Sequence, residues 1–361
     1  MILNNIKKVI VGISGGVDSS IAIYILIKMG YEVIAIYMKN WDNNIKKCNF
    51  NKDLYDSKKV CYKFNVILKK INFSTEYWEN VFVFFLKEYK AGNTPNPDIL
   101  CNKEIKFKIF FNFAINNLKS DYIATGHYSY IKKIKNIFYL LNSFDNNKDQ
   151  SYFLHNLEFK KLKKILFPIC FLKKKELRYI AKKLKLINYD KKDSTGICFI
   201  GKKNFNNFIN SFLYIKPGFI ITKNNQIINT HKGIIYYTIG QRKGLCIGSI
   251  NKNKNPWYVI EKIQNNLIIV QNKKHYLLNS KNLVAKKIYW NINKILLKPL
   301  ICFIKIRYKQ KYNICIIIPI DSKYVIIYFK KPIISITKGQ FVVFYLNKFC
   351  LGGGIIEFKT F

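Results

Sequence analysis

The sequence predicts an α/β fold: a Rossmann-like parallel sheet, then a small mostly-β central domain, then a C-terminal β-barrel. From Lys7 to about Tyr128, apolar runs of strand length alternate with helical patterns, which is typical of a parallel sheet covered by helices on both faces. Beyond Pro217 short strands alternate with turn residues, and Leu300–Phe358 is strand-like with the spacing of a small barrel. The predicted domains are 1–212, 213–280 and 281–361.

Four strands and four helices are expected in the first domain. The strands are Val9–Ser14, Val33–Met38, Val66–Phe73 and Tyr122–Gly126. The helices are Ser19–Met29, Leu54–Phe64, Tyr77–Tyr89 and Glu104–Leu118. Because open parallel sheets bind ligands at the carboxyl ends of their strands, chemistry is expected just after them.

The rest of the chain is expected to be helical first and rich in strands later. Residues 149–185 show helical patterns with clustered lysines, and the polar loop Asp190–Gly201 precedes a short helix, Asn204–Phe212. The later strands are expected at Phe219–Thr222, Ile234–Ile239, Trp257–Ile263, Leu267–Val270, Ile314–Ile318, Val325–Phe329, Phe341–Leu346 and Gly352–Ile356.

The composition indicates a folded, cytosolic protein with a large excess of positive charge. Of its 361 residues 49% are apolar, and no apolar run approaches the ~20 residues that a membrane span needs. A strand leads directly into a glycine loop at the N-terminus, which leaves no room for a cleavable signal. The formal charge is +42, yet only Arg178, Arg242 and Arg307 among 62 basic residues are arginine. Codon drift toward lysine and RNA binding both stay open as causes.

The nine cysteines contain no Cys-x-x-Cys pair, which argues against a structural zinc site or an iron–sulfur cluster. We therefore expect no resident metal. Four cysteines lie in helical or strand patterns and are expected to be packing residues: Cys61, Cys170, Cys302 and Cys315. The pattern leaves Cys48, Cys246 and Cys350 undecided.

The run Ser14–Ser19 (Ser-Gly-Gly-Val-Asp-Ser) follows a strand and opens a helix. Glycines let backbone N–H groups approach phosphate oxygens, and a helix N-terminus favours anions. The lysine of a Walker A loop is absent. The run resembles instead the pyrophosphate-binding loop of ATP pyrophosphatases, enzymes that cleave ATP between the α- and β-phosphates and form an adenylate.

Two cysteines lie in segments that suit chemistry. Pro95 and Pro97 stiffen a turn that presents Cys101 at the expected start of a helix, where the helix N-terminus and nearby lysines should lower the pKa of the thiol. Cys198 lies in a loop between Gly196 and Gly201, where a sulfur carrier could move. From the residues alone, an inert buried thiol stays open for both.

Seven motifs in order resemble those of the bacterial tRNA-specific 2-thiouridylases, members of the PP-loop ATP pyrophosphatase superfamily. They are Gly12–Ser20, Ala91–Phe107, Ala124–Tyr128, Lys148–Leu154, Lys192–Gly201, Thr238–Leu245 and Cys350–Glu357. The resemblance runs from the first strand almost to the C-terminus. It implies ATP-dependent 2-thiolation of the wobble uridine in tRNAs for Lys, Glu and Gln, with release of AMP and pyrophosphate.

The resemblance also implies roles for single residues. Cys101 would be the nucleophile, Cys198 the persulfide carrier and Asp98 an acid or base, with a transient Cys101–Cys198 disulfide as by-product. The nucleotide would be bound by Gly12, Ile13, Ser14, Gly15, Gly16, Val17, Asp18, Ser19, Met38 and Gly126. The target base and the tRNA would be contacted by Asn96, Pro97, Asp98, His127, Lys148, Asp149, Gln150, Arg307, Tyr308 and Gln340.

Further implications concern the cofactors and partners. Mg²⁺ would accompany the polyphosphate of ATP, and sulfur would come from a cysteine desulfurase, directly or through a carrier. One alternative is another PP-loop enzyme that adenylates tRNA or an amide-forming substrate, which would not need two cysteines. A basic RNA-binding protein without activity is a second alternative, and it would not need an intact glycine loop. A 2-thiocytidine enzyme would need the missing Cys-x-x-Cys pair.

Overall fold

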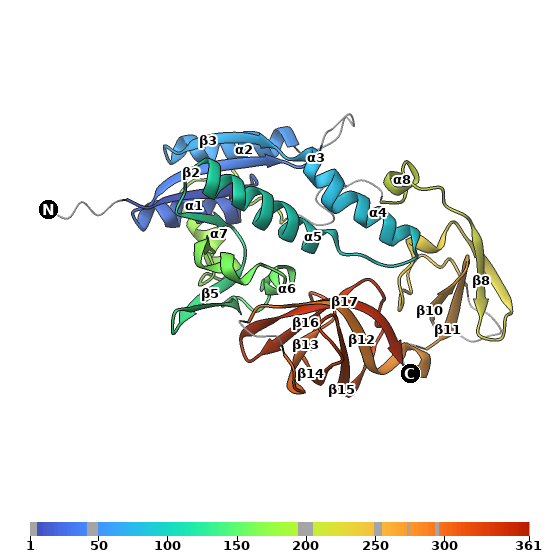
Figure 1. The fold of residues 1–361 in the computed structure, drawn as a ribbon. Coiled ribbons are helices and arrows are strands. Elements are labelled where there is room, and N and C mark those ends of the chain that lie inside the picture. The colour runs from blue at the N-terminus through green and yellow to red at the C-terminus, as the bar shows by residue number, and fades with distance from the viewer. Residues whose placement is uncertain are drawn as a thin grey trace.

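Three β-sheets organise the chain. The structure is a computed structural model that describes residues 6–41, 50–193, 205–248, 255–272, 275–292 and 296–360. A five-stranded sheet comes first, a four-stranded sheet forms the central domain, and an eight-stranded sheet contains the C-terminal barrel. Figure 1 shows the first sheet and its helices above the barrel, with the central domain to one side. The predicted fold class is confirmed.

The first sheet places the ends of β1 and β4 next to each other. Its strands are β1 (Lys8–Ile13), β2 (Glu32–Lys39), β3 (Ile67–Asn72), β4 (Tyr122–Thr125) and β7 (Ile165–Leu166), in the order β3-β2-β1-β4-β7. Every described pairing in it is parallel. The strand order reverses between β1 and β4, and open α/β sheets bind ligands in the crevice outside such a point.

Helices cover both faces of this sheet, because successive residues of a buried strand point to opposite sides. Val9 and Val11 of β1 pack with Ile23 of a helix on one face, whereas Ile10 belongs to a large aromatic core on the other. None of the described helices is long and apolar enough to cross a membrane. The helices are α1 (Val17–Lys28), α2 (Phe50–Lys63), α3 (Ser74–Tyr77), η1 (Trp78–Phe82), α4 (Val83–Lys90), α5 (Pro97–Leu100), η2 (Cys101–Phe110) and η3 (Phe113–Asn117).

The helix that contains Cys101 begins earlier than predicted. It starts at Pro97 rather than at Glu104, because α5 runs directly into η2, and Cys101 therefore lies one turn inside it. Asn96 explains the early start: its Oδ1 accepts hydrogen bonds from the backbone N–H groups of Asp98 and of the following residue, at 3.1 and 3.3 Å. A side-chain cap and a proline at the first position both favour a helix start.

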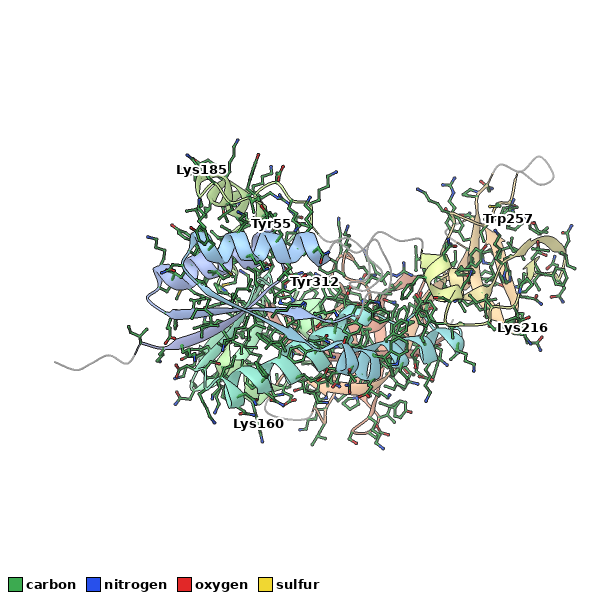
Figure 2. All side chains as sticks on the ribbon, turned by 90° about the horizontal axis from the view of Figure 1, so that it is seen from above. Tyr55, Lys160, Lys185, Lys216, Trp257 and Tyr312 are labelled. Atoms are coloured by element: carbon green, nitrogen blue, oxygen red, sulfur yellow. The ribbon has the colours of Figure 1, made fainter. Side chains whose placement is uncertain are left out.

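The prediction of a helical stretch over 149–185 is wrong for much of its length. The segment contains α6 (Ser151–Leu154), the 3₁₀ turn η4 (Phe159–Lys164), β7 and α7 (Lys174–Lys183). Pro168, which cannot donate a backbone hydrogen bond, follows β7, and β7 itself pairs with β4. The lysines of this stretch do not form one face, since Lys160 and Lys185 lie at opposite edges in Figure 2.

A β-hairpin within the first domain was missed by the sequence analysis. Its strands are β5 (Ser129–Ile134) and β6 (Ile137–Asn142), and the turn residues Lys135 and Asn136 both have positive φ. The hairpin joins the barrel sheet rather than the parallel sheet, because β6 pairs with β17 (Phe349–Thr360). Neither strand alternates regularly: β5 contains the adjacent lysines Lys132 and Lys133, and β6 is almost entirely apolar.

The central domain is a four-stranded sheet preceded by α8 (Phe205–Asn210). Its strands are β8 (Gly218–Thr222), β9 (Ile227–His231), β10 (Trp257–Ile263) and β11 (Asn266–Gln271), in the order β10-β11-β8-β9. The predicted strand at Ile234–Ile239 is wrong, because Ile234–Tyr236 forms the 3₁₀ turn η5. Gly233 and Gly240, with φ values of 153° and 81°, turn the backbone on both sides of it.

The C-terminal barrel closes on itself through a pairing of β12 with β17. Its core includes Leu283, Ile304, Ile317 and Phe344. The predicted boundary at 280/281 falls inside β12, whose first residue is Asn279. The remaining elements are η6 (Tyr276–Leu278), β12 (Asn279–Trp290), β13 (Leu300–Lys305), β14 (Asn313–Pro319), β15 (Tyr324–Ile334) and β16 (Phe341–Leu346).

Candidate active site

The glycine loop lies where the strand order reverses. It joins β1 to α1, and Gly15 has a φ of 72°, a left-handed conformation that favours glycine. The Ser19 Oγ accepts a hydrogen bond from the Ser14 N–H at 3.2 Å and donates one to the Gly16 carbonyl at 3.0 Å. The loop is therefore closed on itself by the first turn of α1.

Missing side chains let neighbouring elements approach this loop. A Cβ on Gly126 would lie 2.6 Å from the Ser19 nitrogen, and a Cβ on Gly12 would lie 3.2 Å from the Cε atom of Met38. The ends of β1, β2 and β4 therefore meet at the start of α1. This arrangement brings together all residues predicted to bind the nucleotide, namely Gly12, Ile13, Ser14, Gly15, Gly16, Val17, Asp18, Ser19, Met38 and Gly126.

Asp18, in the first turn of α1, belongs to a network of ion pairs. The Lys174 Nζ lies 2.6 and 2.8 Å from the two carboxylate oxygens of Asp18 and 2.8 Å from Asp193. Burial raises the pKa of Asp18, although the charge of Lys174 opposes this. Burial alone would also raise the pKa of Asp193, but Lys148 and Lys174 lower it to about 2. The network thus holds an ammonium group beside an anion-binding loop.

A second ammonium group supports the other side of the loop. The Lys191 Nζ donates a hydrogen bond to the Gly15 carbonyl at 3.0 Å and forms ion pairs with Asp53, at 2.7 Å, and with Asp56. The Asn188 side-chain amide donates to the same carbonyl at 3.0 Å. The segment 188–193 and helix α2 together fix the backbone of the loop.

A series of hydrogen bonds connects the loop to the helix that contains Cys101. The Tyr128 hydroxyl donates to Asp18 at 3.2 Å, and the Tyr128 N–H donates to the Gln150 side chain at 2.9 Å. The Gln150 carbonyl accepts from the Phe153 N–H at 2.9 Å, and the Phe153 carbonyl accepts from the Asn102 side chain at 3.3 Å. Asn102 directly follows Cys101, so four sequence motifs meet here.

Cys101 is enclosed by apolar side chains rather than presented at the surface. Its exposed fraction is 2%, and it packs in the same core as Ile99 and Ile105. Asp98 lies in the preceding turn, in the helix that Asn96 caps. The predicted partner Cys198 lies outside the described residues.

His127 lies just beyond β4 and is neutral. Its Nδ1 lies 2.7 Å from the Thr125 Oγ1, and its ring contacts those of Phe107 and Phe167 at centroid distances of 5.8 and 6.0 Å. Burial, with a smaller effect of Lys106, lowers the pKa of His127 well below its ordinary value. A neutral imidazole can exchange hydrogen bonds with a base but adds no charge for a phosphate.

Lys148 and Asp149 have partners within the protein. Lys148 pairs with Asp193 at 2.5 Å. The carboxylate of Asp149, a residue 3% exposed, accepts hydrogen bonds from the N–H groups of Ser143 and Ser151 at 3.2 Å and lies 3.7 Å from the Lys305 ammonium of the barrel. Asp149 is therefore part of the contact between the first domain and the barrel.

Arg307 joins the barrel to the central domain. Its Nη2 donates hydrogen bonds to the carbonyls of Ile239 and Ser335, at 3.3 and 2.9 Å, and to the Thr337 Oγ1 at 3.1 Å. Ile239 belongs to the central domain, whereas the other two acceptors belong to the barrel. A single guanidinium with several donors is well suited to such a junction.

Two more predicted tRNA contacts face the first domain. The ring of Tyr308 packs on Phe153, with the ring centroids 4.6 Å apart. The Gln340 side-chain amide donates to the Thr94 carbonyl at 2.6 Å. Tyr308 therefore contacts α6, and Gln340 contacts the segment that precedes the helix of Cys101.

The other cysteines behave as packing residues where the sequence predicted it. Cys61, Cys170, Cys302 and Cys315 are all buried. Cys350 is also buried, Cys246 is exposed, and Cys48 lies outside the described residues. Burial raises the pKa of Cys61, Cys170 and Cys350 to about 12 in each case, so these thiols stay protonated near neutral pH.

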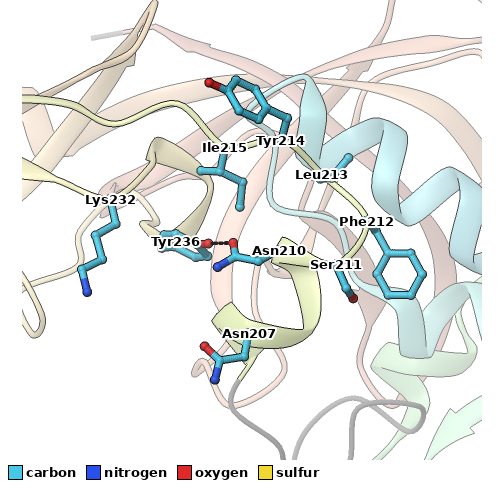
Figure 3. Close-up of a pocket in the computed structure, with 9 residues that line it drawn as sticks. All are labelled: Asn207, Asn210, Ser211, Phe212, Leu213, Tyr214, Ile215, Lys232 and Tyr236. Carbon is cyan, nitrogen blue, oxygen red and sulfur yellow. Dashed lines mark hydrogen bonds between the residues drawn. The ribbon is translucent and has the colours of Figure 1, made fainter. Parts of the chain in front are cut away.

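A cavity of about 670 Å³ lies outside this site, between α8 and η5 (Figure 3). A hydrogen bond from the Tyr236 hydroxyl to Asn210 joins the two sides. None of the residues predicted for the active site lines it. The lining residues are Asn207, Asn210, Ser211, Phe212, Leu213, Tyr214, Ile215, Lys232 and Tyr236.

Comparison with known proteins covers nearly the whole chain. The chain is 52% identical over 362 aligned residues to the tRNA-specific 2-thiouridylase MnmA of Buchnera aphidicola subsp. Acyrthosiphon pisum, covering 99% of this chain and 98% of the relative. It is 48% identical to the protein of the same name from Photorhabdus laumondii, covering 98% of both. The chain belongs to the MnmA family of tRNA-specific 2-thiouridylases.

Three domain models match successive parts of the chain. A tRNA methyl transferase HUP domain matches residues 7–202, a tRNA methyl transferase PRC-barrel domain matches 206–272, and an aminomethyltransferase β-barrel domain matches 280–356. The first range contains the parallel sheet and the hairpin β5–β6, the second contains the central sheet, and the third contains the rest of the barrel sheet. The alignments with the two MnmA relatives cover all three matched ranges of this chain.

Three residues that organise the site were given no individual role from the sequence. Tyr128 lies in a motif that resembles the MnmA family, but only its neighbour His127 was given a role. Lys174 and Lys191 were hidden by composition, because a chain with 62 basic residues offers no contrast for one functional lysine. The position of these lysines in the sequence could have indicated them. Lys174 lies in the first turn of a helix, and Lys191 lies in the loop before Cys198.

Proposed function

We propose that this protein catalyses the ATP-dependent 2-thiolation of the wobble uridine of tRNA. The observation that supports this best is the continuous series of contacts from the glycine loop, through Tyr128 and Gln150, to the helix with Asp98 and Cys101. A nucleotide-activating loop and a thiol thus belong to one structural unit. The relatives' printed name, tRNA-specific 2-thiouridylase, describes such a reaction.

The first half of the reaction is activation of the uracil C2 oxygen. This oxygen would attack the α-phosphate of ATP, with release of pyrophosphate, and would become bound as an adenylate whose leaving group is AMP. Backbone N–H groups of Gly15 and Gly16 and the N-terminus of α1 would hold the phosphates. The Lys174 ammonium, 2.6 Å from Asp18, lies where it could stabilise the polyphosphate charge.

The second half is sulfur transfer. A persulfide on Cys198 would attack C2, and AMP would leave with the former O2 oxygen. The Cys101 thiolate would then attack the Cys198 sulfur of the C2–S–S–Cys198 adduct, releasing 2-thiouridine and forming a Cys101–Cys198 disulfide. Asp98, one turn before Cys101, is the proposed proton donor or acceptor. An external reductant such as a thiol would restore both cysteines.

The RNA substrate would be bound by side chains around this helix. Asn96 and Pro97 are the proposed contacts of the target base, with His127 as a neutral hydrogen-bonding group beside it. Single-stranded bases can be turned out of the anticodon loop and read in this manner. Further proposed tRNA contacts are Lys148, Gln150, Arg307, Tyr308 and Gln340, whereas the buried Asp149 would act only by supporting its neighbours. The proposed substrates are the tRNAs for Lys, Glu and Gln.

Two further partners are proposed. Mg²⁺ bound with ATP would neutralise part of the polyphosphate charge, and the carboxylates of Asp18 and Asp193 are oxygen ligands of the type it prefers. Among the described residues there is no group of three or more His, Cys, Asp or Glu side chains that could hold a metal ion. A cysteine desulfurase, directly or through a carrier, is the proposed sulfur source.

The test is mass analysis of tRNA after incubation of the protein with ATP, Mg²⁺, a sulfide source and unmodified tRNA for Lys, Glu or Gln. Replacement of one oxygen by sulfur at the wobble uridine, dependent on ATP, is the expected result. Adenylated or lysine-bearing tRNA without sulfur would instead favour the alternative named above, another PP-loop enzyme that adenylates its substrate. tRNA binding without any change in mass would favour a non-catalytic RNA-binding protein.

A further inference from the structure

The segment that leads into the helix of Cys101 is held by two other domains. Gly92–Asn96 connects α4 to α5, and its Gly92 and Thr94 carbonyls each accept a side-chain hydrogen bond from a distant part of the chain. The Lys262 Nζ of β10, in the central domain, donates to Gly92 at 3.1 Å. Gln340, in the barrel, donates to Thr94 at 2.6 Å. Three domains therefore meet at this short segment.

The backbone of the barrel contacts the segment as well. The Thr94 N–H donates to the Lys338 carbonyl at 3.1 Å. A Cβ on Gly339, which has a φ of 86°, would lie only 2.9 Å from the Asn93 Cβ and 3.0 Å from the Thr94 nitrogen. Only glycine suits this position, because it combines a left-handed conformation with close backbone approach. The barrel thus fixes the end of the segment nearest Asn96.

A shift of this segment would be passed directly to the reacting groups. Asn96 both ends the segment and caps α5 through the N–H of Asp98 at 3.1 Å. Cys101 follows one turn later in a buried position. Geometry at a reacting centre is sensitive, since a displacement of about 1 Å can change a rate by ~10²-fold.

Lys262 makes its contact with the segment from a half-buried position. Among the described residues its ammonium group has no ion-pair partner, and the Gly92 carbonyl is its one hydrogen-bond acceptor. Burial lowers its pKa to about 8. The half-buried Lys8 likewise donates to a carbonyl, that of Leu118 at 3.1 Å, but within the first domain, whereas the bond of Lys262 joins two domains.

We propose that Lys262 is a positioning residue for sulfur transfer: from the central domain it sets the place of Gly92–Asn96, and through it that of Asp98 and Cys101. This inference rests on the proposed function. It assigns the central domain a part in the chemistry. A tRNA bound to the central domain and the barrel would influence the position of Cys101 through Lys262 and Gln340. The residue itself touches neither ATP nor the target base.

The test combines one structural and one kinetic measurement on the full chain. Alkylation of each cysteine by iodoacetamide is followed by peptide mass analysis, and the rate of thiolation is followed in a single turnover at saturating tRNA and ATP. The variants are Lys262→Met, Lys262→Arg, which keeps a cationic donor, and Lys216→Met, which removes an exposed charge of the central domain (labelled in Figure 2). Cys61, buried in a separate core, reports general loosening.

For Lys262→Met, alkylation of Cys101 should become about fivefold faster with Cys61 unchanged, and the single-turnover rate should fall about tenfold or more. Its tRNA affinity should match that of Lys216→Met, and Lys262→Arg should restore both protection and rate. The inference would be overturned if alkylation of Cys101 stayed as slow as in the wild type, or if alkylation of Cys61 became faster by the same factor. It would also be overturned if the single-turnover rate did not change, or if the variant lost rate only below saturating tRNA. If the wild-type protein alkylates as expected but never thiolates tRNA, the proposed function fails while the alkylation result still decides the role of Lys262.

Discussion

The two ends of the candidate site are held by different kinds of interaction. At the nucleotide end, carboxylates and ammonium groups pair within the first domain, as in the Asp18–Lys174–Asp193 network. At the thiol end, uncharged backbone carbonyls accept hydrogen bonds from the other two domains, through Lys262 and Gln340. The nucleotide end is thus held by ion pairs within one domain, and the thiol end by hydrogen bonds from the other two domains.

This difference has a functional meaning. Ion pairs beside an anion-binding loop can exchange partners when a polyphosphate arrives, because its oxygens compete for the same ammonium groups. Hydrogen bonds to backbone carbonyls hold one geometry and respond only when the domains move. The nucleotide end is therefore suited to binding and release, whereas the thiol end is suited to precise placement of Asp98 and Cys101.

The largest effect is expected from Cys101→Ser. A hydroxyl of ordinary pKa cannot replace a thiolate in an exchange reaction, so thiolated tRNA should become undetectable while ATP still binds. Mass analysis of tRNA and a nucleotide-binding titration are the measurements. Cys61→Ser, at a buried position in another core, is the control and should retain activity. Normal thiolation by the Cys101 variant would remove this residue from the chemistry.

The nucleotide end is tested by Asp18→Ala. The change leaves the Lys174 ammonium with Asp193 as its remaining ion-pair partner and removes a carboxylate from the first turn of α1. Pyrophosphate release in the presence of tRNA should be eliminated, with little effect on tRNA affinity. Asp190→Ala, at an exposed position in the chain leading to Asp193, is the matched control. Pyrophosphate release at the wild-type rate would show that the loop was assigned wrongly.

The nucleotide end of the site could be predicted from the sequence better than the thiol end. The glycine loop is a run of adjacent residues, so its place after β1 and the convergence of Met38 and Gly126 on it could be read from strand ends. The contacts of Lys262 and Gln340 join residues separated by 170 and 246 positions. A hydrogen bond to a backbone carbonyl leaves no pattern in either sequence segment, and its existence depends on how the domains dock.

Local structure failed for physical reasons as well. The hairpin β5–β6 escaped because β5 interrupts its apolar residues with two adjacent lysines and β6 is almost entirely apolar, so neither strand alternates. Its partner strand β17 also lies some two hundred residues later, where Leu141 pairs with Phe349. Asp149 illustrates the same limit. In the sequence it is one polar residue of a turn, but the barrel covers it and supplies Lys305 as its partner, so its burial could not be read locally.

Arg307→Met distinguishes a domain junction from an RNA contact. The change leaves three acceptors without their guanidinium donor, which should destabilise the protein by about 1–3 kcal/mol in chemical unfolding. A structural role predicts that the slope of log affinity for tRNA against log salt stays unchanged. A slope lower by about one unit, without loss of stability, would instead mean that Arg307 binds a phosphate.

Gln340 provides the barrel's side-chain hydrogen bond to the thiol end. Gln340→Ala removes the bond to Thr94, and the single-turnover thiolation rate should fall severalfold, corresponding to about 1 kcal/mol. Gln340→Glu should be worse, because a carboxylate would face the Thr94 carbonyl without a proton to donate. Equal rates for the two variants would contradict this role, and a change confined to tRNA affinity would favour a direct RNA contact.

The smallest effect concerns pH and follows from Lys262. Burial lowers its pKa to about 8 in the folded protein, below the ordinary lysine value of about 10.4, so between these limits the unfolded chain binds more protons than the folded one. Stability contributed at this position should therefore rise with pH in that window, by no more than about 1.4 kcal/mol per pH unit and by less for a half-buried group. Unfolding by urea at pH 8, 9 and 10 should show this slope as a difference between the wild type and Lys262→Met. Parallel curves would mean that Lys262 is hydrated in solution, and its hydrogen bond from the central domain to Gly92 would then not hold the thiol end.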